Sequence, residues 1–97
     1  MALTKSNTKR KKLIKCKVHV CIIKEQIGYT AFCANLPGVV TEGETVFSTL
    51  VHLDMALSCV INLYVNHNSG NRIPFCSFYV LPREYYKLFW MDVIVEC

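Results

Sequence analysis

GYTAFCANLPGVVTEGET, residues 28–45, is the stretch that decides the fold. The β-branched and aromatic residues in 29–34 predict a strand. A turn follows this strand, because Pro37 presets its own φ angle and Gly38 can adopt the left-handed conformation. Residues 39–41 then predict a short further strand. Two neighbouring strands of an antiparallel sheet are therefore expected here.

The residues before this stretch predict another strand of the same sheet. Apolar residues occupy every second position from Ile14 to Ile22, and Lys15, Lys17 and His19 stand between them. This alternation is typical of a strand with one face in the core and one face in water. A turn that ends at Gly28 joins it to the next strand. The first three strands should form an antiparallel meander.

The residues after this stretch predict one long helix. Apolar residues recur three or four positions apart, the spacing of one helical face: Val46, Leu50, Leu53, Leu57, Val60, Ile61 and Tyr64. Gly43 makes the turn into the helix, and Thr45 is the expected N-cap. Ser48 stands where a capping box prefers Glu or Gln, so we expect an incomplete box. Residues 66–70 should end the helix after about twenty residues, or about 30 Å.

The C-terminal part predicts an irregular segment followed by a last strand. Residues 75–88 are aromatic and are interrupted by Pro82, which favours a loop. Residues 89–96 alternate again, which favours a fourth strand. The expected fold is α+β, with the order β-β-β-α-β and the helix packed on one face of the sheet. We expect a single domain over residues 13–97, preceded by a flexible basic arm, residues 1–12.

Positive charge is concentrated in the arm and at the start of the first strand. The chain has a net charge of +4, and seven of its eleven basic residues precede Val18, whereas the remainder has four basic and seven acidic residues. A basic arm of this kind can contact the phosphates of a nucleic acid. The candidate residues are Lys9, Arg10, Lys11, Lys12 and Lys15. The alternative is a solubilising tail without a ligand.

The composition favours a cytoplasmic protein. No uninterrupted apolar stretch follows the basic start, so no export signal is expected. Residues 46–65 are long enough to cross a bilayer, but Asp54 in the middle would cost about 3 kcal/mol there. We therefore expect no membrane segment. The six cysteines should be reduced thiols, most of them buried.

Catalytic and metal-binding groups are sparse, so we predict no enzyme, no cofactor and no metal. Glu42 and Glu44 favour solvent and the helix dipole over a metal ion. His52 and Asp54 are two positions apart in the helix and point to different sides. None of the three histidines (His19, His52 and His67) lies in a motif that would activate a cysteine.

The quoted stretch resembles the hallmark of HicB-like antitoxins. In that family a strand of the form G-Y-x-A leads through L-P-G into a short strand, then through G-x-T into a long amphipathic helix. These elements match residues 28–31, 36–38 and 43–45 here, and Arg72-Ile73-Pro74 matches the family's exit from the helix. The resemblance covers roughly residues 14–75.

The resemblance implies a reduced RNase H-like fold and a protein that binds and blocks a small RNA-cleaving toxin of the HicA type. It leaves open whether this chain has such a toxin partner, because stand-alone members of such families occur. Many members also carry a C-terminal DNA-binding segment, but only nine residues follow Leu88. We therefore do not expect that segment to repress transcription here. The alternative function is a nucleic-acid-binding or regulatory module that acts through the basic arm.

Aromatic residues and arginines of the C-terminal part are the candidates for the partner interface, since these residue types are favoured at interface centres. They are Arg72, Phe78, Tyr79, Arg83, Tyr85, Tyr86 and Trp90. Packing on the sheet is an alternative role for several of them, and stacking on bases is another. An exposed edge strand and the 53% of apolar residues further favour a homodimer.

Overall fold

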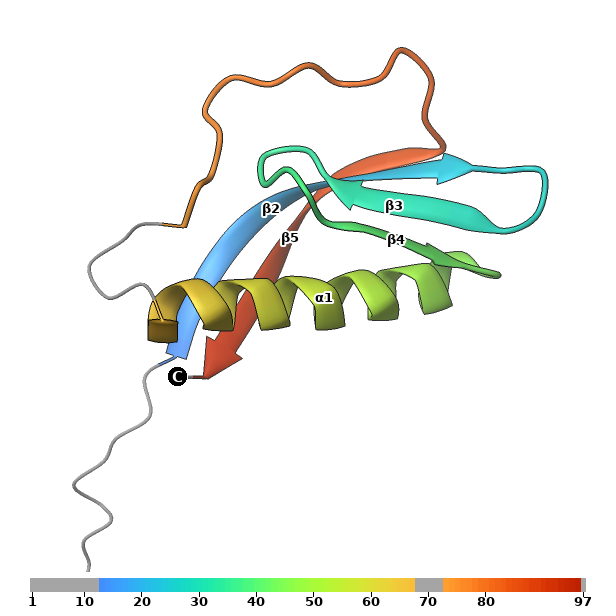
Figure 1. Ribbon diagram of the computed structural model, residues 1–97. Coiled ribbons are helices and arrows are strands. Elements are labelled where there is room, and N and C mark those ends of the chain that lie inside the picture. The colour runs from blue at the N-terminus through green and yellow to red at the C-terminus, as the bar shows by residue number, and fades with distance from the viewer. Residues whose placement is uncertain (1–12, 68–72, 97) are drawn as a thin grey trace, which may run out of the picture.

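A four-stranded sheet with one helix on one face makes up the described part of the chain, residues 13–67 and 73–96 of a computed structural model (Figure 1). The elements are β2 (Leu13–Lys24), β3 (Tyr29–Cys33), β4 (Val40–Gly43), α1 (Val46–His67) and β5 (Lys87–Glu96). All neighbouring strands are antiparallel, in the order β4-β3-β2-β5. The predicted α+β fold with the order β-β-β-α-β is confirmed. The arm, Arg72 and most of the expected helix stop lie outside the described residues.

Strand β2 is the centre of the sheet. It pairs with β3 from Val20↔Cys33 to Lys24↔Tyr29, and with β5 from Leu13↔Glu96 to Ile22↔Lys87. Its predicted alternation is confirmed, because the residues at every second position from Cys16 to Ile22 are buried on the inner face, the face that packs against α1. Cys21 is also buried, although it points to the outer face. The sheet is therefore covered locally on both faces.

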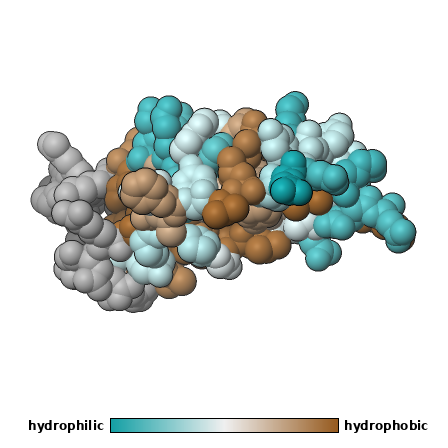
Figure 2. All heavy atoms as spheres, turned by 90° about the horizontal axis from the view of Figure 1, so that it is seen from above, coloured by the Kyte–Doolittle hydropathy of each residue, from teal (hydrophilic) through white to brown (hydrophobic). Residues whose placement is uncertain are grey.

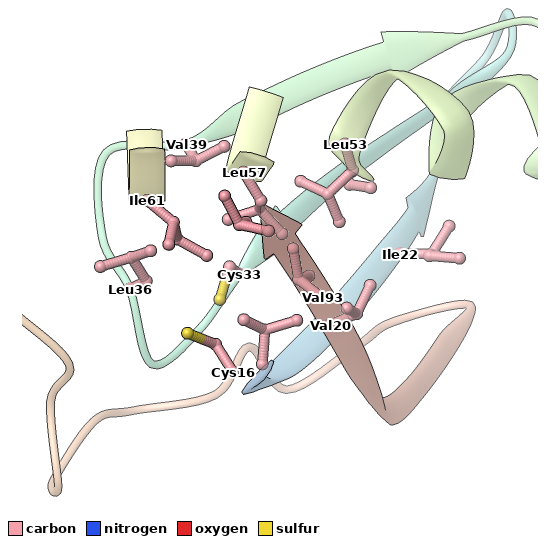
Figure 3. Packing of buried hydrophobic residues seen from close by; sticks show 13 residues of the cluster. Cys16, Val20, Ile22, Cys33, Leu36, Val39, Leu53, Leu57, Ile61 and Val93 are labelled. Carbon is pink, nitrogen blue, oxygen red and sulfur yellow. The ribbon is translucent and has the colours of Figure 1, made fainter. Parts of the chain in front are cut away.

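The core lies between α1 and the inner face of the sheet. Leu53, Leu57 and Ile61 point from the helix toward β2 and β5 and are fully buried (Figure 3). Leu36 and Val39, from the connection between β3 and β4, close one side of this cluster. Truncating a leucine in such a core to alanine typically costs about 2–5 kcal/mol. By length and composition alone, α1 could span a membrane. In this structure, however, the face of α1 that carries Leu53, Leu57 and Ile61 packs on the sheet.

The predicted N-cap is confirmed, and the capping box is complete. The Ser48 amide donates to Thr45 Oγ1 at 3.0 Å, and the Thr45 amide donates in return to Ser48 Oγ at 3.1 Å. The expectation of an incomplete box was wrong, because a serine hydroxyl reaches the N-cap amide as a Glu or Gln side chain does in the usual box. The exposed N-terminus of α1 thus satisfies two backbone amides with its own side chains.

Gly28 and Gly38 both adopt the left-handed conformation that their turns were expected to need, with φ angles of +80° and +99°. A Cβ atom on Gly28 would also collide with the Gly43 carbonyl oxygen, whereas one on Gly38 would meet open space. Gly43 itself lies against the first turn of α1, where a Cβ would be 2.5 Å from Thr49 Oγ1. Glycine at positions 28 and 43 therefore lets the hairpin approach the start of the helix.

The strand boundaries differ slightly from those predicted. Strand β5 starts at Lys87, two residues earlier than expected, and β4 covers Val40–Gly43 instead of residues 39–41. Val39 is buried in the core before the strand begins, and Gly43 pairs with Tyr29 at its end. Residues 73–86 contain no helix or strand, as predicted for most of this segment.

Candidate partner-binding surface

The segment 73–86, called the aromatic loop below, crosses the side of the sheet opposite α1 (Figure 1). It exposes two large apolar side chains almost completely, Phe78 at 95% and Val80 at 93%. Tyr85, Tyr86 and Trp90 are about half exposed. Figure 2 looks onto this side and shows hydrophobic side chains across its middle and hydrophilic ones at the hairpin end. The outer side of the molecule thus presents apolar surface to solvent.

His19 joins the aromatic loop to the sheet. Its ring stacks on Trp90 of β5 with a centroid distance of 4.2 Å and an interplanar angle of 4°. Nδ1 of His19 shares a hydrogen bond of 2.9 Å with the Tyr79 hydroxyl, and the Tyr79 ring meets the imidazole edge to face. The position of His19 opposite Trp90 follows from the β2–β5 register. The cluster holds the middle of the loop on the outer face.

Backbone hydrogen bonds fix the loop on either side of this cluster. The Cys76 amide donates to the Asn35 carbonyl at 2.8 Å, and the Tyr86 amide donates to the Ile22 carbonyl at 2.7 Å. Phe78 and Val80 lie between these two anchors. Phe78 and Val80 are therefore exposed on a segment that is bound to the rest of the domain at Cys76, Tyr79 and Tyr86.

A second aromatic pair lies near the hairpin between β2 and β3. Tyr86 and Tyr29 meet edge to face at 5.3 Å, and the Lys24 ammonium lies 4.8 Å from the centre of the Tyr29 ring. A shallow hollow of about 260 Å³ adjoins them, lined by Ile23, Lys24, Glu84, Tyr85 and Tyr86. The predicted interface residues thus fall into two groups, one around His19 on the outer face and one at the hairpin end around Tyr29, which packs against the core on the inner face.

The hairpin end also carries an acidic hollow of about 650 Å³. It is lined by Glu25, Ile27, Gly28, Tyr29, Thr30, Glu42, Gly43 and Glu44. Three carboxylates and no basic side chain line it, so its surroundings favour a cationic group. The Glu42 carbonyl accepts a hydrogen bond of 2.7 Å from His52 Nδ1, which ties β4 to α1 beside the hollow.

The structure brings together some of the residues predicted for binding. Tyr79 and Trp90 meet through His19, Tyr85 and Tyr86 line one hollow, and Phe78 is separately exposed. Arg83 is exposed, as is Lys15 on the outer face of β2. Arg72 and the arm residues 9–12 lie outside the described part of the chain. These interface and nucleic-acid assignments therefore stay predictions.

Sequence reasoning missed His19 and Val80 as members of this surface. His19 was expected only as a polar residue on an exposed strand face, and its partner becomes visible only with the register of β2 and β5. Val80 lies in a segment without periodicity, so nothing in its spacing distinguishes a buried from an exposed valine. A single-sequence argument therefore carries no signal for either residue.

Among the described residues the candidate metal ligands stay apart, and burial keeps two of the thiols in their protonated form. No three His, Cys, Asp or Glu side chains in ranges 13–67 and 73–96 come together as metal ligands. Cys16 lies on the inner face, whereas His19 lies on the outer one. Burial raises the pKa of the Cys21 thiol, and it also raises that of Cys33, partly offset by hydrogen bonds with the backbone of Asn35, Leu36 and His19. Neither thiol is therefore activated as a nucleophile.

A search of protein-family models, of curated proteins and of solved structures gives no match to this chain.

Proposed function

We propose that this chain is a HicB-like antitoxin, or a stand-alone relative of that family, which binds and neutralises a small HicA-type RNA-cleaving toxin by direct contact and without catalysis. The motif residues support this reading by their places in the fold. Tyr29 and Ala31 lie on β3, residues 36–38 make the turn into β4, and Thr45 caps α1. The order and the spacing of the family's hallmark therefore correspond to real elements of the domain.

The observation that carries the proposal is the nearly complete exposure of Phe78 and Val80 in a loop anchored at Cys76, Tyr79 and Tyr86. When a partner covers large apolar side chains that project from a fixed loop, the loss of water contact stabilises the complex. The surrounding tyrosines and Trp90 are residue types that dominate interface energetics. This side of the molecule is accordingly suited to a protein partner.

The charge distribution suits a basic partner, as small RNA-binding proteins usually are. The acidic hollow places Glu25, Glu42 and Glu44 around one opening at the hairpin end. Complementary charge of this kind accelerates encounter and selects the partner more than it adds affinity. The toxin would therefore contact the aromatic loop with apolar surface and the hairpin end with basic side chains.

The test is neutralisation of a purified HicA-type toxin, beginning with the product of the adjacent gene where that gene encodes one. The full chain should inhibit its RNA cleavage at stoichiometric concentration. The double variant Phe78→Ala/Val80→Ala should weaken binding by roughly 30-fold or more, because truncated interface anchors cost about 2 kcal/mol or more. Both side chains contact mainly solvent, so circular dichroism and the melting temperature should not change.

The control is Met55→Ala on α1, on the other side of the sheet, where the side chain is 61% exposed. It removes a comparable amount of apolar surface away from the loop and should reduce binding much less. If no HicA-type toxin is bound, the proposal is wrong. Equal effects of the loop variant and the helix variant would show that the aromatic loop is not the contact surface.

The second candidate function, nucleic-acid binding, is favoured by the outer face of β2. Lys15 and Lys17 stand there four and two residues before His19, on the same face as the half-exposed Trp90. Phosphate contacts from lysines and stacking on an aromatic ring are the usual means of binding single strands. Affinity for an oligonucleotide should then fall steeply with salt, and Lys15→Ala/Lys17→Ala should reduce that slope. Binding that is insensitive to salt would contradict this candidate.

A further inference from the structure

Strand β5 is a long edge strand. It pairs with β2 over ten residues, from Leu13↔Glu96 to Ile22↔Lys87, and no strand in the described residues lies along its other edge. Edge strands of this length are usually protected by a proline, a covering segment or inward charges. The sequence of β5, KLFWMDVIVE, contains no proline, and its one charged residue on the inner face, Lys87, stands at the first position of the strand. The edge therefore has little of the usual protection against pairing with another strand.

The sequence of β5 is compatible with antiparallel pairing to itself about Met91. In that register Phe89 lies opposite Val93 of the second copy on the inner face, and Leu88 lies opposite Ile94 on the outer face. Trp90 lies opposite Asp92, and Met91 meets Met91 on the axis. Aromatic, β-branched and other apolar residues opposite one another stabilise a sheet, and here no like charges are opposed.

Symmetry selects this register from its neighbours. Two antiparallel strands related by a two-fold axis in one sheet must place their inner faces on the same side. Each residue then faces a residue of the same face in the other copy, so the pairing register can change only in steps of two residues. A shift in one direction puts Asp92 opposite Asp92 of the other copy, which brings two carboxylates together. A shift in the other direction loses pairs at the ends of the strand. The register centred on Met91 avoids both penalties.

A groove beside the end of β5 supports a second copy as the occupant of this edge. It has a volume of about 550 Å³, is mostly apolar, and is lined by Ser58, Cys59, Asn62, Leu63, Ile94, Val95 and Glu96. In the Met91 register, Glu96 lies opposite Tyr86 of the second copy. The residues that precede Lys87 in that copy would then lie against the groove and cover its apolar surface.

We propose that β5 pairs with β5 of a second copy about a two-fold axis through Met91, which joins two four-stranded sheets into one continuous antiparallel sheet. Both helices then lie on one side of this sheet and both aromatic loops on the other. The dimer presents two copies of the candidate partner surface in the same direction. This inference concerns the edge of the sheet and is independent of the toxin proposal.

Light scattering after gel filtration tests the proposal on the full chain. The wild type should have twice the mass of one chain at micromolar concentration. Ile94→Lys should weaken the dimer by roughly 100-fold or more, because it places an unpaired ammonium against Leu88 at both symmetric contacts. Ile94 is 59% exposed on the outer face, so the monomer should stay folded. The matched controls are Ile27→Lys at the hairpin and Val40→Lys on β4, the other edge strand, and both should remain dimeric.

A cysteine at the axis provides the second measurement. In a background with Cys59→Ser, Cys76→Ser and Cys97→Ser, Met91→Cys should form a disulfide between two chains on mild oxidation, because facing Cα atoms in an antiparallel pair are about 4.5–5.5 Å apart. Glu84→Cys, placed before the strand, should not. A wild type that is monomeric at all concentrations would overturn the proposal. So would a dimer that Val40→Lys disrupts and Ile94→Lys leaves intact.

Discussion

A single buried amide, that of Asn35, extends the contact between β2 and the β3–β4 connection beyond the last paired residues. Its Oδ1 accepts the His19 amide at 2.9 Å, and its Nδ2 donates to the Lys17 carbonyl at 3.1 Å. The Cys33 thiol donates to the same oxygen at 3.0 Å. The side chain thus takes the place of a strand backbone, and it pairs with a partly buried donor and a partly buried acceptor of β2.

Asn35→Ala should lower the free energy of unfolding by about 2–4 kcal/mol, because it leaves at least two backbone groups of β2 without a partner. Urea denaturation would measure the loss, and hydrogen exchange should show faster exchange at the His19 amide. Asn35→Asp is the informative control. It keeps an acceptor for His19 but loses the donor to Lys17, so it should also destabilise the domain. A loss below about 0.5 kcal/mol for Asn35→Ala would contradict this role.

The roles of individual residues could be predicted from the sequence only where they are local. Gly28 and Gly38 were correctly expected to take positive φ angles, because a turn between two strands needs this conformation at a fixed position. Asn35 was expected only as a turn residue. Its contacts with β2 span 16 and 18 residues, so they depend on a tertiary arrangement that a sequence pattern does not contain.

At the scale of elements, the first turn of α1 depends on two hydroxyl groups that cap each other's backbone. Thr45→Ala should cost about 1–2 kcal/mol, and Ser48→Ala should cost less than 1 kcal/mol. The double variant should lose less than the sum, since each side chain accepts from the amide of the other residue. Thermal melts followed by circular dichroism would measure these changes.

Ser58→Ala is the matched control, because the same change in the middle of α1 removes no capping bond and introduces a better helix former. It should be neutral or slightly stabilising. If Ser48→Ala behaved in the same way as Ser58→Ala, the second hydrogen bond of the capping box would contribute nothing.

The existence and order of the elements followed from periodicity, because strands and helices with one buried face must repeat their apolar residues. For the aromatic loop, the sequence predicted only an irregular segment without a helix or a strand. Its position over the outer face rests on the stack of His19 with Trp90 and on the hydrogen bond to Tyr79, which join residues up to 71 positions apart. The part of the fold that carries the candidate surface was therefore the least predictable.

At the scale of the whole molecule, two buried thiols should lower the free energy of unfolding at alkaline pH. Burial raises the pKa of Cys21 and Cys33 above the ordinary value of 9.0 in the folded state. The unfolded chain therefore releases these protons at lower pH than the folded chain does. Their contribution to stability is complete below pH 9 and is lost as the pH rises through the folded-state values.

Urea denaturation at pH 7 and pH 10 should show a lower free energy of unfolding at the higher pH. Cys21→Ala/Cys33→Ala should reduce this difference, although it also lowers stability at both pH values through lost packing. Alkylation at pH 8 should modify the exposed Cys59 well before either buried thiol. Rapid modification of Cys21 or Cys33 in the folded protein would contradict the burial described above.

The register between β2 and β5 has a consequence for how the protein is made. The first strand of the domain pairs with its last one, so residues 13–22 must wait on the ribosome until residues 87–96 have been synthesised and released from the exit tunnel. Contacts between such distant parts of a chain slow folding, because a long loop must close before they form. The nascent chain would meanwhile keep one edge of β2 open to chaperones, and a transcript that ends before codon 87 would encode a sheet without its longest pairing.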